Sequence, residues 1–252
     1  FGNGEFGGVP VLLSKETLDQ KKISQKHIYH AQMLLKPMGL GFSIFKVDDL
    51  VFYDRLNEDG NYYITTDPAV NPLYTKGNKN DKTSMWLLKS SKGRRIDIVD
   101  HLYDRIGLKE KWEQLKQWVT RYNLDQIGYE EYGTQKDREF FELKMEEERF
   151  YFTITPIKGD LSSKADRIAK LVPFFTEKKI RFPKTLMRFT KDKGAIDVIT
   201  DFIENEYKTY PNVAHDDRLD SLSIFTKLDI IYPEGEAPPE ETLDYRKRYN
   251  HD

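Results

Sequence analysis

The sequence contains no cysteine, so disulfide bonds, thiolate metal sites and cysteine nucleophiles are all excluded. It also has no apolar run that approaches the ~20 residues of a membrane-spanning helix. Charged residues make up 33% of the chain, but charges of opposite sign nearly cancel and the net charge is only −2. This balance predicts no global attraction to nucleic acid or to a membrane surface, so any such contact would have to come from local basic clusters.

What is present indicates a folded α/β protein. A chain of 252 residues with 13% aromatic residues is long enough to bury a core, and its composition argues against disorder. Three antiparallel-looking strands followed by alternating helices and strands predict a mixed β-sheet covered by helices on both faces. Strands are expected at residues 62–66, 84–90, 95–103, 126–130 and 149–157, a hairpin at 180–190, and helices at 14–36, 109–122, 133–148, 164–178, 196–207 and 216–231.

The most informative segment is AHDDRLDSL at residues 214–222, which reads as a helix with an acidic first turn. At helical spacing, Asp216 and Asp217 each lie on the same face as Asp220. Two carboxylates about 4 Å apart repel each other by roughly 4 kcal/mol at an effective dielectric near 20. A divalent cation would offset that cost. Alternatively, the acids could only stabilise the helix N-terminus, or Arg218 could neutralise part of the cluster.

Further acids stand at the ends of predicted strands. Asp67 ends a β-rich run, although the following Pro68 means that it could also be a simple turn starter. Glu130 and Glu131 end a later strand, and side chains alternate between faces along a strand. Only one of the two glutamates can therefore point toward a site shared with Asp67.

The order and spacing of these motifs resemble the nuclease domain of the large terminase subunit of tailed bacteriophages, from about Lys15 to Tyr232. The resemblance implies an α/β fold of the ribonuclease H-like class, with a mixed β-sheet flanked by helices on both faces. Three motifs resemble the family's acidic signatures: YITTDPA the first-strand signature, IGYEEYGTQ the strand with the second acid, and HDDRLDSL the C-terminal acidic signature. The segment SKADRIAKLVPFFTEKKIRFP resembles the helix and strand that follow the second acid. The segment HAQMLLKP resembles the stretch that joins the packaging ATPase to the nuclease.

The chain has no phosphate-binding loop of the G-x-x-x-x-G-K-[ST] type. The resemblance therefore implies a nuclease domain cut from a longer motor protein, with the ATPase part absent. It implies a connector over residues 1–55, a nuclease domain over residues 56–233 and a loosely ordered tail over residues 234–252.

The same resemblance implies a two-metal site for hydrolysis of phosphodiesters. Two divalent ions about 3.5–4 Å apart can activate water and stabilise the leaving oxygen. Mg²⁺ or Mn²⁺ suits such a site, because hard cations prefer oxygen ligands. The expected catalytic acids are Asp67, Glu130 and Asp217, and the expected metal ligands are these three together with Asp216 and Asp220.

Other residues are expected around these acids. Glu131 and His215 would lie beside the metal ligands, although Glu131 could instead be solvated and His215 could equally be a histidine near the helix cap with no metal role. Basic side chains would hold the DNA backbone, although lysine and arginine are common on any solvated surface. The candidates for DNA contact lie in or beside the predicted hairpin or at the start of the helix at 164–178: Lys164, Arg167, Arg181, Lys184, Arg188 and Lys191.

The function implied is a metal-dependent endonuclease that cuts concatemeric double-stranded DNA during genome packaging in the host cell cytoplasm. Its partners in the full-length protein would be the portal and the small terminase subunit, with no membrane. Two rival functions stay open: a non-catalytic module that docks DNA or the portal, and a ribonuclease H-like recombinase or resolvase.

The missing phosphate loop generates a first prediction. The purified chain should hydrolyse no ATP by itself, because nothing in its sequence supplies the phosphate cradle of an ATPase. A steady-state phosphate-release assay checks this, and turnover above a buffer control would contradict the interpretation that the ATPase part is absent.

Overall fold

The computed structural model describes residues 43–56, 59–69, 82–122, 124–130, 135–158 and 162–236. Contacts divide the chain into two units, residues 1–44 and 45–252, and nearly all described residues belong to the second. The helix predicted at 14–36 and most of the predicted tail lie outside the described residues. Within the described ranges, no helix is both long enough and apolar enough to cross a membrane.

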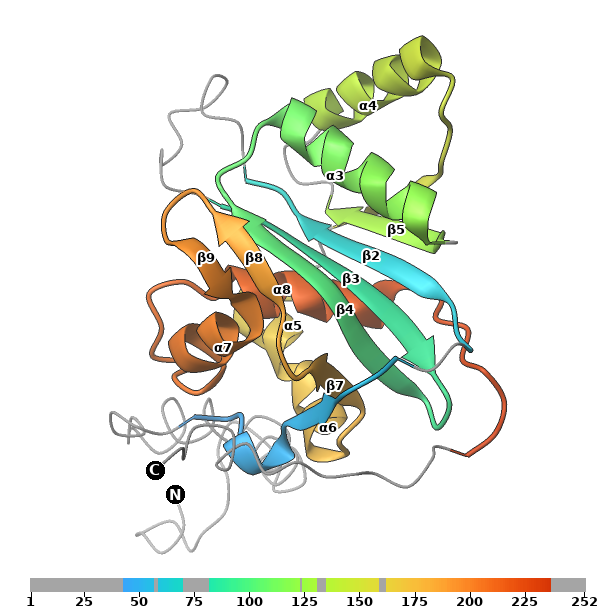
Figure 1. Cartoon of the computed structure of the whole chain (residues 1–252). Coiled ribbons are helices and arrows are strands. Elements are labelled where there is room, and N and C mark those ends of the chain that lie inside the picture. Colours follow the sequence, from blue (N-terminus) through green and yellow to red (C-terminus); the bar gives the residue numbers. More distant parts are fainter. Residues whose placement is uncertain are drawn as a thin grey trace, which may run out of the picture. The chain divides into compact units, whose positions relative to one another are not determined.

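A seven-stranded mixed sheet forms the centre of the second unit (Figure 1). The strand order is β1-β7-β4-β3-β2-β5-β6, and β3 alone runs antiparallel to its neighbours. The strands span β1 (Val51–Tyr53), β2 (Tyr62–Asp67), β3 (Thr83–Ser91), β4 (Arg95–Asp104), β5 (Leu124–Glu130), β6 (Ile154–Ile157) and β7 (Ile180–Pro183).

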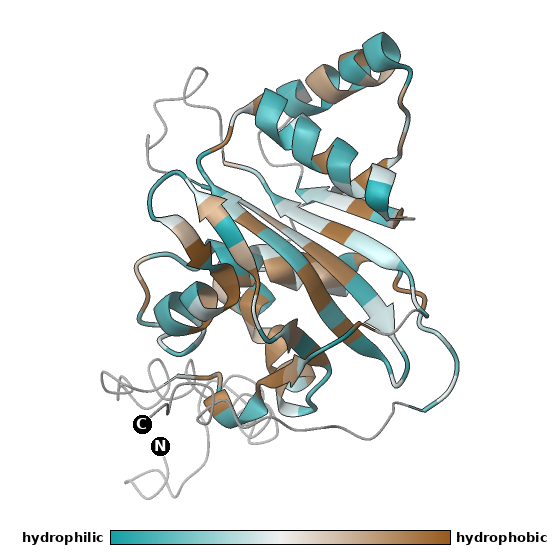
Figure 2. Cartoon of the chain, viewed as in Figure 1, coloured by the Kyte–Doolittle hydropathy of each residue, from teal (hydrophilic) through white to brown (hydrophobic). Residues whose placement is uncertain are grey.

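One face of the sheet is covered by α3 (Leu108–Arg121) and α4 (Gln135–Glu148). The apolar residues of α3 recur at helical spacing, so Trp112, Leu115 and Trp118 share one face and are buried against the sheet. Figure 2 shows that the rest of both helices is largely hydrophilic. The apolar stripe of α3 therefore holds that helix to the sheet, and Phe141 of α4 is buried in the same core.

The opposite face is covered by the later helices. Trp86 on β3 donates its indole N–H to the backbone oxygen of Arg218 at 2.9 Å, which ties α8 to the middle of the sheet. Helices on both faces of a mixed sheet were predicted, and this arrangement is confirmed. The elements of this face are α5 (Lys164–Ala169), α6 (Leu171–Thr176), α7 (Val198–Phe202) with a π-helical turn at Ile203–Tyr207, and α8 (Asp217–Ser223) with a 3-10 turn at Ile224–Lys227.

Several predicted boundaries need correction. The strand predicted at 149–157 begins only at Ile154. The helix predicted at 164–178 is split at Lys170, because Pro173 has no N–H with which to continue it. β1 lies in the segment predicted as a connector, and it pairs with β7 at the edge of the sheet.

The predicted hairpin at 180–190 is wrong. Ile180 and Phe182 are fully buried, and their strand β7 lies between β1 and β4 in the main sheet. The hairpin that forms instead joins β8 (Met187–Thr190) to β9 (Gly194–Asp197). Gly194 supplies the positive φ, 71°, that follows the turn. The apolar strand β7 is therefore buried in the main sheet instead of pairing with β8, the strand that follows it in the sequence.

Gly128 on β5 generates a prediction about packing. A Cβ atom there would lie 2.9 Å from Leu228 Cδ2 and 3.4 Å from Ile224 Cγ2, in the turn that follows α8. Gly128→Val should therefore reduce the free energy of unfolding by about 1–3 kcal/mol through overpacking. Gly128→Ala should cost less, because the methyl end of Leu228 can move. Denaturant unfolding of both variants checks this, and equal stability of Gly128→Val and wild type would contradict it.

Candidate active site

Two carboxylates reach the α8 face of the sheet from the ends of neighbouring strands. On β2 the Tyr63 hydroxyl accepts a hydrogen bond from the N–H of Ile231 at 2.8 Å, and Asp67 lies on the same face four residues later. On β5 Gly128 faces the turn after α8, so Glu130 shares that face. Because β2 and β5 are parallel neighbours, both acids stand at the same edge.

Helix α8 brings two more carboxylates to this edge. Burial raises the pKa of Asp67 well above its usual value, and the negative charges of Glu130, Asp220 and Asp217 raise it further. The ammonium of Lys164 partly opposes this rise. The structure therefore gathers four acids from β2, β5 and α8 closely enough for each of the other three to act on Asp67.

Two cations from α5 compensate the acids of α8. The ammonium nitrogen of Lys164 lies 2.7 Å from an oxygen of Asp216 and 2.8 Å from an oxygen of Asp217. Burial lowers the pKa of Lys164, but these contacts outweigh it and raise the pKa above its usual value. The guanidinium of Arg167 donates hydrogen bonds from Nε and Nη2 to the two carboxylate oxygens of Asp220, at 2.9 and 2.5 Å. The negative charges of α8 are thus neutralised by α5, whose Lys164 and Arg167 lie 53 residues before Asp217 and Asp220 in the sequence.

The donor set suits a hard divalent cation. Carboxylate oxygens are the ligands that Mg²⁺ and Mn²⁺ prefer, and burial together with the charges of the neighbouring acids raises the pKa of Asp67. No group of three or more histidine, aspartate or glutamate side chains in the described ranges has the spacing needed to hold a metal ion. His215 is exposed beside α8, and Glu131 lies outside the described residues.

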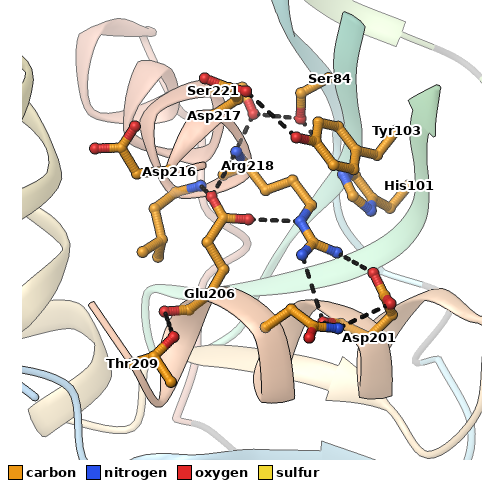
Figure 3. A network of polar contacts seen from close by, with 12 residues as sticks. Ser84, His101, Tyr103, Asp201, Glu206, Thr209, Asp216, Asp217, Arg218 and Ser221 are labelled. Atoms are coloured by element: carbon orange, nitrogen blue, oxygen red, sulfur yellow. Dashed lines mark hydrogen bonds and ion pairs between the residues drawn. The ribbon is translucent and has the colours of Figure 1, made fainter. Parts of the chain in front are cut away.

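A buried ion pair fixes the start of α8 (Figure 3). The carboxylate of Glu206 accepts the backbone N–H groups of Arg218 and Leu219 at 2.9 and 3.2 Å, and the Arg218 guanidinium at 2.5 Å. Asp216, at the N-cap position, makes no capping bond with its own side chain. Glu206, which lies in the π-helical turn, therefore caps α8 from another element.

Burial is the largest effect on Glu206 and raises its pKa to about 7, while Arg218 and the two backbone N–H groups favour the ionised form. Arg218 also pairs with Asp201 at 2.8 Å and lies over the ring of Tyr103. The guanidinium thus forms its ion pairs with Glu206 and Asp201 rather than with the acids of α8, which speaks against the alternative that Arg218 neutralises the cluster. Its side chain instead anchors the helix that carries the acids.

A comparison with known families identifies this arrangement. The family described as the terminase RNaseH-like domain matches residues 64–226, from β2 to the turn after α8. The chain belongs to this family. Both the resemblance stated from the motifs and the ribonuclease H-like fold class are confirmed. No curated protein sequence matches the chain.

Solved structures of terminases are similar to this terminase RNaseH-like domain. The human cytomegalovirus terminase nuclease domain is 13% identical with a TM-score of 0.51, over 72% of this chain and 91% of that one. The large terminase nuclease of thermophilic phage G20c is 15% identical with a TM-score of 0.44, over 72% and 96%. The large terminase of bacteriophage HK97 is 7% identical with a TM-score of 0.46, over 84% of this chain and 50% of that one.

Every basic residue suggested for DNA contact is paired with a carboxylate. Besides Lys164 and Arg167 at the site, Arg181 is buried and binds both oxygens of Asp97 at 2.6 and 2.7 Å. The side chain of Arg181 is 11% exposed, so it offers little surface to a DNA backbone. The remaining pairs are at the surface or partly buried: Lys184 with Asp54, Arg188 with Asp100, and Lys191 with Glu110.

Sequence patterns did not reveal two residues that shape the site. Tyr103 on β4 donates its hydroxyl to Asp217 at 3.3 Å, and its position at the end of an alternating strand was the only available signal. Glu206 has no local signal at all, because its partners lie 12 and 13 residues later.

The Glu206 cap generates a prediction about stability. Glu206→Ala should reduce the free energy of unfolding by about 3–5 kcal/mol, because it leaves the buried Arg218 charge without its main partner. The matched control is Glu204→Ala, which removes a surface pair with Lys208 and should cost about 0–1 kcal/mol. Denaturant unfolding measures both, and similar losses in the two variants would rule out the proposed anchor.

Proposed function

We propose that this chain is the metal-dependent DNA endonuclease domain of a terminase large subunit. It would hydrolyse phosphodiester bonds of concatemeric double-stranded DNA during genome packaging. The observation that carries this proposal is the gathering of Asp67, Glu130, Asp217 and Asp220 from three elements at one edge of the sheet. Membership of the terminase RNaseH-like family supports a nuclease role for that edge.

The chemistry follows from the donor set. A bound pair of Mg²⁺ or Mn²⁺ ions would supply Lewis-acid activation of water and stabilisation of the departing oxygen. Asp67, Glu130 and Asp217 are the residues that would hold such ions, with Asp216 and Asp220 as further ligands. The hydroxyl of Tyr103 orients Asp217 by donating to one of its oxygens, and Arg167 holds Asp220 side-on.

Binding of DNA would require basic side chains to exchange a carboxylate partner for a phosphate. Exposed surface pairs contribute little to stability, so such an exchange costs little. Lys191 is the clearest candidate, because its side chain is 52% exposed while it pairs with Glu110. Within the full-length protein, we infer partnership with the portal and the small terminase subunit in the host cell cytoplasm.

One rival has an observation in its favour. The acids of α8 are already neutralised by Lys164 and Arg167, and a non-catalytic module that only docks DNA or the portal would need no metal. Metal-dependent cleavage of plasmid DNA separates the two functions, because the docking module predicts none.

The test of the proposal is Asp67→Asn. This change keeps the shape of the side chain and removes one anionic ligand, so plasmid cleavage with Mg²⁺ or Mn²⁺ should fall by more than the roughly 10–100-fold that loss of a supporting group costs. Folding should survive. The pKa of Asp67 is raised in the folded state, so its ionisation destabilises the metal-free fold increasingly as pH rises above about 4. At neutral pH the melting temperature should therefore stay level or rise.

A matched control removes the same kind of charge elsewhere. Asp59 pairs with Lys92 at 2.9 Å on the surface, and Asp59→Asn should leave cleavage unchanged. If the folded Asp67→Asn variant cleaves like wild type, Asp67 is not part of the site.

A further inference from the structure

The ammonium of Lys164 lies among the carboxylates of α8. Its nitrogen is 2.7 Å from Asp216, 2.8 Å from Asp217 and 3.9 Å from Asp220. Lys164 is the first residue of α5, and the hydroxyl of Ser163 caps that helix by accepting the N–H of Asp166. The backbone of Lys164 is therefore held in place, while its side chain remains 36% exposed.

The two cations at the cluster differ in how firmly they are held. Arg167 is 17% exposed and makes a two-oxygen contact with Asp220, which is 6% exposed. A planar guanidinium in this geometry is a fixed partner. Lys164 is a compact point charge on a flexible stem, and the oxygens it contacts belong to partly exposed aspartates. The cluster thus combines one fixed cation with one that can leave toward solvent.

The contacts of Lys164 are those that a divalent cation would need. A hard cation that binds Asp216 or Asp217 would use the same oxygens that now accept from the ammonium. Two cations cannot occupy the same short contacts, since like charges about 4 Å apart repel by roughly 4 kcal/mol at a dielectric near 20. Binding of metal on this side of the site therefore requires the ammonium to move.

We propose that Lys164 is a built-in counter-ion of the metal-free site, which a divalent cation displaces when it binds. The proposal rests on the proposed metal-dependent function and adds a regulatory step to it. While it is paired, Lys164 offsets the repulsion between Asp216 and Asp217, and it lowers the affinity of the site for metal.

The test is metal affinity in the absence of DNA. Lys164→Met keeps much of the apolar stem and removes the charge. Calorimetric titration with Mn²⁺ should give a dissociation constant lower than that of wild type by about tenfold or more, because the ion no longer competes with an ammonium. The melting temperature should fall without metal and rise further on addition of Mn²⁺ than that of wild type.

Three further variants sharpen the test. Lys116→Met breaks a lysine–carboxylate pair with Glu148 away from the site and should leave Mn²⁺ affinity unchanged. Lys164→Arg keeps the charge and should bind Mn²⁺ no more tightly than wild type. If Lys164→Met does not fold, Lys164→Gln should show the same tightening, because it also removes the charge but keeps a hydrogen-bond donor.

The outcomes separate this inference from the proposed function. Unchanged or weaker Mn²⁺ binding by folded Lys164→Met, with wild type binding and cleaving, would overturn the counter-ion role and leave the nuclease proposal standing. Absence of Mn²⁺ binding in wild type and in both uncharged variants would overturn both. Binding by Lys164→Met alone would support the counter-ion role in its strongest form.

Discussion

Repulsion among carboxylates is the constraint that the rest of this site has to meet. Asp67, Glu130, Asp217 and Asp220 come from three elements. Burial raises the pKa of Asp67, and the charges of the other three acids raise it further. Such a cluster is unfavourable unless cations or hydrogen-bond donors surround it. The fold supplies both, because α5 places Lys164 and Arg167 against α8, and β4 places the Tyr103 hydroxyl beside Asp217.

A second set of interactions keeps the acidic helix in place without adding to its negative surface. The buried pair of Arg218 and Glu206 caps the start of α8, and Trp86 holds the helix to the middle of the sheet. A buried ion pair is weak support for overall stability but strongly penalises the loss of one partner. Because loss of either partner is costly, the pair keeps α8 in a fixed position, with its acids close to Asp67 on β2, the neighbour of Glu130 on β5.

The basic residues suggested for DNA contact are also part of the balance between positive and negative charges. In the part of the chain that the structure describes, the six residues considered for DNA contact each pair with an acid. Local exchange of partners is therefore the route by which a phosphate backbone could be held. Arg181 differs from the others because its carboxylate partner, Asp97 on β4, is fully buried.

The sequence by itself determined the local elements and the positions of the acids. A β-rich composition placed β2, alternation placed β4, helical spacing placed α3 and α8, and the order of the acidic motifs indicated the family. These features depend on short periods along the chain, so they are visible without a structure. The same periods show that Asp67 and Glu130 end strands, although they cannot show that the two strands are neighbours.

Tertiary structure alone decided which distant segments meet. β7 joins the main sheet because Ile180 and Phe182 gain burial there, which left β8 to pair with β9. The partner of Arg218 is Glu206 rather than the adjacent aspartates, and the acids of α8 are neutralised from α5. These ion pairs depend on the packing of elements whose residues are from 12 to 53 positions apart in the sequence. No local pattern carries that information, because the free energy that selects each partner arises only when the core is assembled.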